Sequence, residues 1–236
     1  MQIAKFIAAG VLALTTPAAP DAHAGPVRAE PLAQLPIVAQ PTSASGDSLV
    51  VFYSGDGGWA GLDKGLTEGL AHAGVPVVGF DSLRYFWNGK SPDQAAADLA
   101  EVLEHYMAAW RRDRVILAGY SFGAGALPPI VARLPQELRS RIRVVALVGV
   151  EPYGDLHFHL GSWLDRRSPS AYPLAPILAS LRDVPIVCIY GDRDEKATAC
   201  PTLAPGAVRA IRVSGDHHFA GDYDGLGRTV LKSAGL

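Results

Sequence analysis

From residue 48 onward, short apolar stretches alternate with segments of helical periodicity, and this alternation leaves the chain few possible architectures. The apolar stretches are hydrophobic almost throughout, as in parallel strands that are covered on both faces. They comprise residues 49–53, 75–80, 114–118, 143–148, 184–190 and 208–213. Helices are expected at residues 62–73, 92–111, 124–134, 174–181 and 222–234. We therefore predict an α/β fold with a mostly parallel, doubly wound sheet of about six strands and helices on both faces.

The first 24 residues have the pattern of a secretory signal peptide. Lys5 precedes an almost wholly apolar stretch at residues 6–14, and the sequence AHA at residues 22–24 provides an A-x-A cleavage site. The apolar stretch is shorter than the about 20 residues that a membrane-spanning helix needs. We expect residues 1–24 to be removed on export, residues 25–46 to form a linker or N-terminal arm, and residues 47–236 to form one domain.

The charge balance argues against several classes of partner. The chain has 21 basic and 23 acidic residues, and loss of Lys5 and Asp21 with the signal peptide leaves the net charge at −2. No block of Lys or Arg stands out, so we expect no nucleic-acid partner. The net charge does not favour electrostatic adhesion to anionic membranes either.

The two cysteines, Cys188 and Cys200, form an even and closely spaced pair. In an exported protein such a pair permits a disulfide, here between a strand and the loop behind it. Closing a loop of this length is worth about 3 kcal/mol in the chain-entropy view. The alternative is two unrelated buried thiols.

The strand predicted at residues 114–118 leads directly into the sequence GYSFG at residues 119–123. A G-x-S-x-G sequence between a strand and a helix is typical of a nucleophile elbow, a sharp turn that exposes its serine. Ser121 is therefore the candidate nucleophile, and the backbone N–H of Phe122 is expected to face a developing oxyanion. The alternative is a glycine-rich turn with a structural serine.

A nucleophilic serine needs a base and an orienting acid, and in this strand–turn–helix context the acid precedes the base along the chain. The strand predicted at residues 184–190 is followed by Gly191 and then by three candidate acids. Asp194, at the third position past the glycine, is preferred, and Asp192 and Glu195 remain alternatives.

The last predicted strand is followed by the sequence SGDHHF at residues 214–219. A histidine in this loop is the expected base, and the G-x-H-x-F spacing favours His217 over the alternative His218. Adjacent histidines point apart on an extended chain, so the pair is a poor joint metal site.

The sequence SGDGGW at residues 54–59 follows the first predicted strand. In such folds this loop supplies the second oxyanion donor, and the N–H of Asp56 or Gly57 is the candidate. No Lys-Ser/Thr pair follows the glycines, so a phosphate-binding loop is not expected.

Four sequence runs together closely resemble the AcvB/VirJ family of bacterial virulence proteins. They are GDGGW at 55–59, DSLRYFW at 81–87, GYSFG at 119–123 and HHF at 217–219. The resemblance covers most of residues 48–235 and implies a periplasmic protein with the α/β-hydrolase fold. Some members are described as lysyl-phosphatidylglycerol hydrolases, and others were linked to type IV secretion and virulence. Some carry a second, upstream domain, and this chain is expected to be the short, single-domain form.

The resemblance implies an ester hydrolase without a cofactor. Ser121 would attack the lysyl ester with His217 as base, giving an acyl-enzyme that water releases. Asp81 is expected to pair with the lysine amino groups and Arg84 with the lipid phosphate, although an ion pair between these two residues is the alternative. Tyr85 belongs to the same candidate binding loop.

Three aromatic residues are candidates for an apolar, lipid-facing mouth. They are Trp59, Phe86 and Trp87, with ordinary core packing as the alternative, above all for Phe86. Another cluster, Glu151-Pro152-Tyr153-Gly154-Asp155 with His157 and His159, permits a metal site. We expect it to be a loop or part of a lid, and we expect no metal.

The expected partner is thus an aminoacylated phospholipid, reached by transient contact with the membrane surface. Components of a type IV secretion system are possible protein partners. Two alternatives remain open: a generic esterase or thioesterase for a soluble substrate, and a non-enzymatic periplasmic adaptor that keeps the hydrolase fold.

Overall fold

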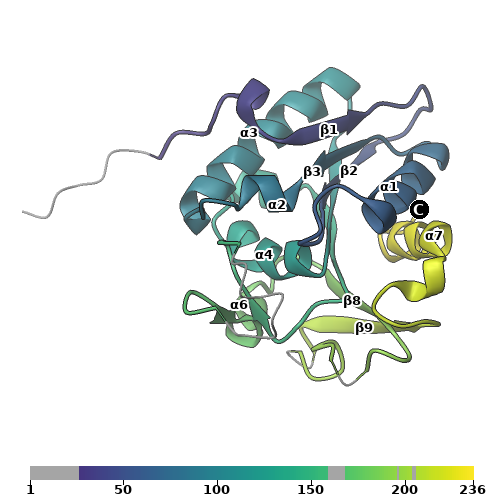
Figure 1. The fold of residues 1–236 in the computed structure, drawn as a ribbon. Helices are drawn as coiled ribbons and strands as arrows, with labels where there is room; N and C mark the ends of the chain where they lie inside the picture. Colours follow the sequence, from purple (N-terminus) through teal and green to yellow (C-terminus); the bar gives the residue numbers. More distant parts are fainter. Residues whose placement is uncertain (1–26, 159–167, 196, 204–205) are drawn as a thin grey trace, which may run out of the picture.

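A computed structural model describes residues 27–158, 168–195, 197–203 and 206–236 (Figure 1). The expected signal peptide, residues 1–24, lies outside this part of the chain. One seven-stranded sheet forms the centre of the molecule. Across the sheet, the strands follow the order β1 (Ile37–Gln40), β3 (Val77–Phe80), β2 (Ser48–Tyr53), β4 (Arg114–Tyr120), β5 (Ile142–Val148), β8 (Ile186–Gly191) and β9 (Val208–Val213).

All neighbours in this sheet are parallel except β1, which pairs antiparallel with β3. The six strands predicted from the sequence are confirmed, and β1 is the seventh. A two-stranded antiparallel sheet, β6 (Tyr153–Gly154) with β7 (Tyr172–Pro173), lies in the connection between β5 and β8. Because six strands are parallel, their carboxyl ends meet at one edge of the sheet.

Helices cover both faces of the sheet, as predicted (Figure 1). The helices are α1 (Gly61–His72), α2 (Ser82–Tyr85), α3 (Pro92–Trp110), α4 (Phe122–Val131), α5 (Gln136–Arg139), α6 (Leu174–Ser180) and α7 (Tyr223–Ser233), with 3-10 turns η1 (Leu32–Gln34) and η3 (Phe219–Gly221). One face carries the apolar side chains of α3, α4 and α6, and the other carries those of α1 and α7.

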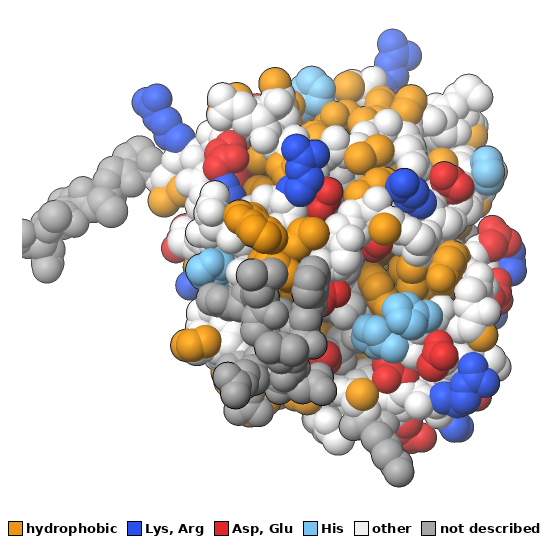
Figure 2. All heavy atoms as spheres, in the orientation of Figure 1, with side chains coloured by type: hydrophobic (Ala, Val, Ile, Leu, Met, Phe, Trp, Pro, Cys, Tyr) orange, Lys and Arg blue, Asp and Glu red, His pale blue; other side chains and the backbone are white. Residues whose placement is uncertain are grey.

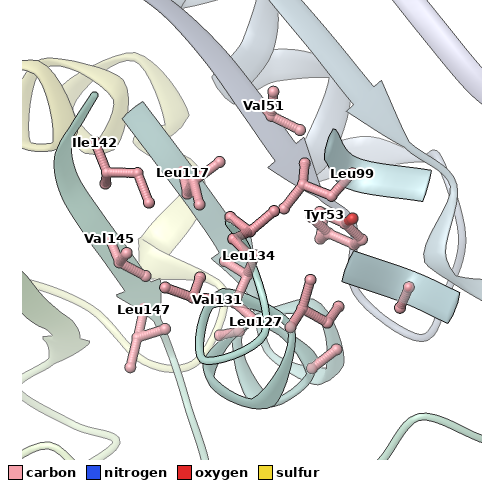
Figure 3. Packing of buried hydrophobic residues seen from close by; sticks show 14 of the residues in the cluster. Val51, Tyr53, Leu99, Leu117, Leu127, Val131, Leu134, Ile142, Val145 and Leu147 are labelled. Carbon is pink, nitrogen blue, oxygen red and sulfur yellow. The ribbon is translucent and has the colours of Figure 1, made fainter. Parts of the chain in front are cut away.

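Strand β2 shows why these stretches are hydrophobic without interruption. All six of its residues are buried. Its side chains alternate between the two layers: Val51 and Tyr53 pack toward α3 and α4, whereas Val50 and Phe52 pack toward α1 and α7. Figure 3 shows the first layer, in which side chains of β2, β4 and β5 pack against those of α3 and α4.

Helix α4 is buried along its whole length after Phe122 and contains two consecutive prolines. Pro129 has no N–H to donate to the carbonyl of Gly125 four residues earlier. The hydroxyl of Tyr172 donates to that carbonyl instead, at 3.2 Å. A side chain from the β7 strand thus replaces a missing helical hydrogen bond beneath the candidate nucleophile.

The segment predicted to be a linker or arm, residues 25–46, is instead partly built into the fold. β1 adds an edge strand to the sheet, and Arg112 donates to the carbonyl oxygens of Ala44 and Gly46. The prediction failed because four residues of an edge strand show no clear alternation, with Val38 exposed.

Asp98 anchors the start of this segment. It is fully buried, and its carboxylate accepts from the N–H of Glu30 at 2.7 Å, from Gln94 at 2.8 Å and from the hydroxyl of Tyr85 at 2.6 Å. Lys90 forms an ion pair with Glu30 beside it. The carboxylate therefore joins the N-terminal segment to α2 and α3.

Replacing Asp98 with alanine is expected to lower the free energy of unfolding by about 3 kcal/mol, because three donors lose a fully buried acceptor. In a chain of this size this corresponds to a fall in Tm of roughly 10 °C. Urea unfolding followed by circular dichroism measures the effect. Asp93→Ala, which removes an exposed carboxylate from the same helix, serves as the control and should change stability by under about 0.5 kcal/mol. Equal effects of the two substitutions would contradict the anchoring role.

The predicted disulfide is confirmed. Cys188 in β8 is bonded to Cys200, and their Cα atoms lie 5.4 Å apart. The bond closes the stretch of chain that carries Asp192, Asp194 and Glu195, so it restrains the loop in which the acid was predicted. Within the described residues, no helix is long and apolar enough to cross a membrane.

Candidate active site

Ser121 lies in a strained turn between β4 and α4. Its backbone angles are φ 50° and ψ −111°, a conformation that L-residues rarely adopt. A methyl group on Gly123 would lie 2.4 Å from the carbonyl oxygen of Tyr53, and one on Gly119 would lie 2.6 Å from that of Gly123. Only glycine fits at both positions, so the G-x-S-x-G sequence has the geometry of a nucleophile elbow.

Three side chains from loops far apart in the sequence meet at the carboxyl edge of the sheet. Nε2 of His217 lies 3.1 Å from Oγ of Ser121, and Nδ1 of His217 lies 2.9 Å from Oδ2 of Asp194. The Asp194 side chain is 12% exposed and the His217 side chain 31%. With its proton on Nδ1, His217 can donate to Asp194 and accept the hydroxyl proton of Ser121.

The alternative residues for acid and base have other contacts. Asp192 accepts from the N–H of Gly215 at 3.0 Å and so holds the loop that carries His217. Glu195 lies at the surface, 3.9 Å from Arg212. His218 is exposed, and its Nδ1 lies 3.3 Å from the hydroxyl of Tyr120. The structure therefore brings His217 and Asp194 to Ser121, and not these three residues.

Tyr120 contacts the candidate base His217, and it was not predicted from the sequence. Its buried hydroxyl donates to the backbone carbonyl of His217 at 3.2 Å, and its ring lies 5.2 Å from the His217 ring. A methyl group on Gly55 would lie 2.9 Å from the same ring. Burial raises the pKa of Tyr120, so its hydroxyl stays protonated and able to donate. The one signal in the sequence was that Tyr120 directly precedes the candidate nucleophile Ser121.

The candidate oxyanion donors lie around the nucleophile. The N–H of Phe122 is at the first turn of α4, where helices leave their N–H groups unpaired. A methyl group on Gly55 would lie 3.9 Å from Cβ of Ser121, which places the 54–59 loop beside the nucleophile. Among the described residues, the N–H groups of Phe122, Asp56 and Gly57 have no acceptor. They are therefore available to a developing oxyanion.

The loop after β3 lies next to the oxyanion loop. Oδ1 of Asp81 accepts from the N–H of Arg84 at 3.2 Å and so caps α2. A methyl group on Gly58 would lie 3.2 Å from the same oxygen. Arg84 is exposed, and within the described part of the chain it forms no ion pair with Asp81. The alternative of a structural ion pair is therefore not observed.

Three aromatic residues predicted near the substrate belong to the packing of the molecule. Tyr85 is 3% exposed, and its hydroxyl donates to Asp98, so its assignment to substrate binding is corrected. Phe86 is fully buried, in agreement with core packing. The ring of Trp59 covers Gly79 of β3, where a methyl group would lie 1.8 Å from it. Local sequence could not show this, because the rings meet partners from other elements.

Trp87 is the aromatic residue of this group that reaches the surface. Its side chain is 51% exposed, and its ring stacks on Phe158 with centroids 5.5 Å apart. Figure 2 shows exposed apolar side chains on the same face of the molecule as histidine and acidic side chains. Among the described residues, no three His, Cys, Asp or Glu side chains are placed to hold a metal. His159 lies outside the described residues, so the H-x-H pair is not placed.

The family model of the bacterial virulence protein VirJ matches residues 47–235, which agrees with the resemblance of the four sequence runs. No curated protein matches the sequence.

Several solved structures share this fold. MenH from S. aureus is 14% identical with a TM-score of 0.60, and the match covers 85% of this chain and 99% of that chain. Est1E from Butyrivibrio proteoclasticus is 13% identical with a TM-score of 0.59, covering 85% and 94%. Naproxen esterase from Bacillus subtilis is 14% identical with a TM-score of 0.56, covering 83% and 86%. At these identities the likeness establishes the α/β-hydrolase fold.

Proposed function

Because this chain belongs to the VirJ family of bacterial virulence proteins, we propose that it is a periplasmic serine hydrolase that cleaves carboxylic esters. The observation that carries the proposal is the pair of contacts made by His217, 3.1 Å to Ser121 and 2.9 Å to Asp194. A histidine that bridges a strained serine and a largely buried carboxylate is not needed to hold the edge of a sheet. The same arrangement is what nucleophilic ester hydrolysis requires.

In the proposed reaction, Oγ of Ser121 attacks the ester carbonyl while Nε2 of His217 takes the hydroxyl proton. Asp194 holds the imidazolium through Nδ1–H. The N–H groups of Phe122 and of Asp56 or Gly57 stabilise the negative oxygen of the tetrahedral intermediate. The intermediate collapses, His217 returns the proton to the leaving alcohol, and water then hydrolyses the acyl-enzyme by the same steps.

We propose the aminoacyl ester of lysyl-phosphatidylglycerol as substrate. Support comes from family membership and from charge. Asp56 lies in the loop beside Ser121, and Asp81 lies next to Gly58 of that loop, where carboxylates suit the amino groups of a lysyl ester. Arg84 is exposed and free to meet a phosphate, and Trp87 offers an aromatic ring to a membrane surface. The disulfide agrees with an oxidising compartment such as the periplasm.

Purified protein is expected to release free lysine from vesicles that contain lysyl-phosphatidylglycerol. Its kcat/KM should exceed that for alanyl-phosphatidylglycerol by at least about 10-fold, equivalent to ~1.4 kcal/mol, because the alanyl ester lacks the side-chain ammonium group. Liquid chromatography of the released amino acid measures both rates. Faster cleavage of a soluble p-nitrophenyl ester, with no amino acid released, would instead favour a generic esterase.

A non-enzymatic role as an accessory protein of type IV secretion is the alternative. It predicts that a Ser121→Ala strain keeps full secretion and virulence, whereas deletion of the whole gene does not. The bridging contacts of His217 favour the enzyme, because binding alone does not require them.

A further inference from the structure

A buried carboxylate that the proposed chemistry does not use lies beneath the oxyanion loop, residues 54–60. Asp63, in the first turn of α1, is 5% exposed. Its Oδ1 accepts from the N–H of Gly55 at 3.1 Å, and its Oδ2 accepts from the N–H of Ala60 at 3.4 Å. One side chain therefore joins the beginning of the loop to its end.

Ordinary helix capping explains only one of these two contacts. An acidic residue at the third helical position commonly accepts from the N–H of the residue that precedes the helix, here Ala60. Gly55 lies five residues further back, outside any capping motif, and directly against Ser121. The contact with Gly55 thus holds the residue immediately before Asp56, and the N–H of Asp56 is a candidate oxyanion donor.

Other hydrogen bonds also hold the beginning of the loop, but none of them involves a carboxylate. The carbonyl of Gly55 accepts from the N–H of Gly58 at 3.2 Å and from the hydroxyl of Ser54 at 3.1 Å. The same hydroxyl accepts from the N–H of Ser82 at 2.9 Å. Within the described residues, Asp63 is the one carboxylate that accepts from the backbone of this loop. Without it, the N–H of the peptide between Ser54 and Gly55 loses its acceptor, and the beginning of the loop is no longer joined to its end.

We infer that Asp63 is a positioning residue: its carboxylate holds the oxyanion loop so that the N–H of Asp56 or Gly57 faces the carbonyl that Ser121 attacks. The inference rests on the proposed hydrolase function. Oxyanion donors act only when they are held in place before the reaction, so a loop with one anchor removed should bind substrate but stabilise the intermediate poorly.

Burial makes this anchor sensitive to pH. Burial raises its pKa to about 6, the N–H groups of Gly55 and Ala60 oppose the shift, and Asp81 adds to it. Asp56, in the loop above, and Tyr120, on β4, also face this region, and the pKa of Tyr120 is raised in turn by Asp63. Tyr223, on α7, adds to the shift of Tyr120 and packs against α1.

The raised pKa determines how stability and activity should respond to pH. The folded protein binds the Asp63 proton more tightly than the unfolded chain, so the associated stability is present below about pH 4 and is lost as pH rises through about 6. The ionised form is the stronger acceptor for backbone N–H groups. Ionisation of Asp63 is therefore expected to lower stability and to raise activity.

The test is Asp63→Asn, which keeps the size of the side chain and removes its charge. At pH 8 we expect kcat for ester hydrolysis to fall by about 10²-fold, the usual effect of losing one oxyanion donor, with KM changed by less than about 3-fold. The ratio of wild-type to variant kcat should shrink toward one as pH falls below 6. Taking the ratio removes any pH dependence that the two proteins share.

Asp98→Asn is the matched control, because Asp98 is also a buried carboxylate that accepts from a backbone N–H. We expect this variant to lose Tm and to keep kcat, whereas Asp63→Asn should lose kcat and keep its Tm at pH 8. If Asp63→Asn does not fold, Asp63→Glu restores the carboxylate and should show a reduced kcat in a folded protein.

The outcomes separate this inference from the proposed function. Wild-type protein that does not react with a fluorophosphonate would overturn the hydrolase proposal itself. Wild-type protein that reacts, together with an Asp63→Asn variant of unchanged kcat, would overturn only the role of Asp63. A parallel loss of Tm and kcat in Asp63→Asn would reduce the residue to a helix cap.

Discussion

Replacing Ser121 with alanine is expected to abolish covalent labelling by a fluorophosphonate probe and to lower kcat for ester hydrolysis by about 10⁴- to 10⁶-fold. The reason is that alanine offers no oxygen to attack the carbonyl or the phosphorus, while the remaining groups only bind and polarise the substrate. Mass spectrometry of the labelled protein and hydrolysis of a chromogenic ester provide the two measurements.

The backbone conformation at Ser121 determines how the same substitution should affect stability. Its positive φ is maintained by the packing of Gly119 and Gly123 against β2 and α4, and not by the serine side chain. We therefore expect Ser121→Ala to fold with a Tm close to that of the wild type. Ser140→Ala, at an exposed serine between α5 and the beginning of β5, is the control and should label normally. A wild-type protein that resists labelling would remove the basis for an enzyme.

The second large effect is expected on kcat/KM when one of the two adjacent histidines is replaced by alanine. His217→Ala is expected to lower kcat/KM by about 10⁴-fold or more, because Ser121 loses the group that accepts its proton. His218→Ala should stay within about 3-fold of the wild type, since exposed side chains remote from the reacting atoms contribute little. Steady-state hydrolysis of a soluble ester by the two variants measures the difference.

Each histidine variant serves as the control for the other, because each removes one imidazole from the same loop. His218 contacts the hydroxyl of Tyr120, which also donates to the carbonyl of His217. A small effect of His218→Ala on the orientation of His217 is therefore compatible with the assignment. The reverse order, with His218→Ala inactive and His217→Ala fully active, would show that the base has been wrongly identified.

Much of the fold could be predicted because its signals are local. A strand buried on both faces must be apolar at successive positions, and the six parallel strands were found within about two residues on that basis. The elbow was predicted for a similar reason: a strained turn packed against β2 requires glycines at 119 and 123. The edge strand β1 was missed because it has only four residues, none of them fully buried, so it shows no continuous apolar stretch.

The sequence by itself determined the order of the elements, the candidate nucleophile and the set of acids and histidines from which a candidate base and its partner could be drawn. Only the tertiary structure decided among them: His217 and His218 have nearly the same local sequence, and contact with Ser121 across the sheet edge is what distinguishes them. The same holds for Tyr85, which is buried against Asp98, and for Asp63, which reaches back to Gly55. Local sequence limits the backbone conformation of each segment, whereas these side-chain partners are set by packing between segments that are far apart in the chain.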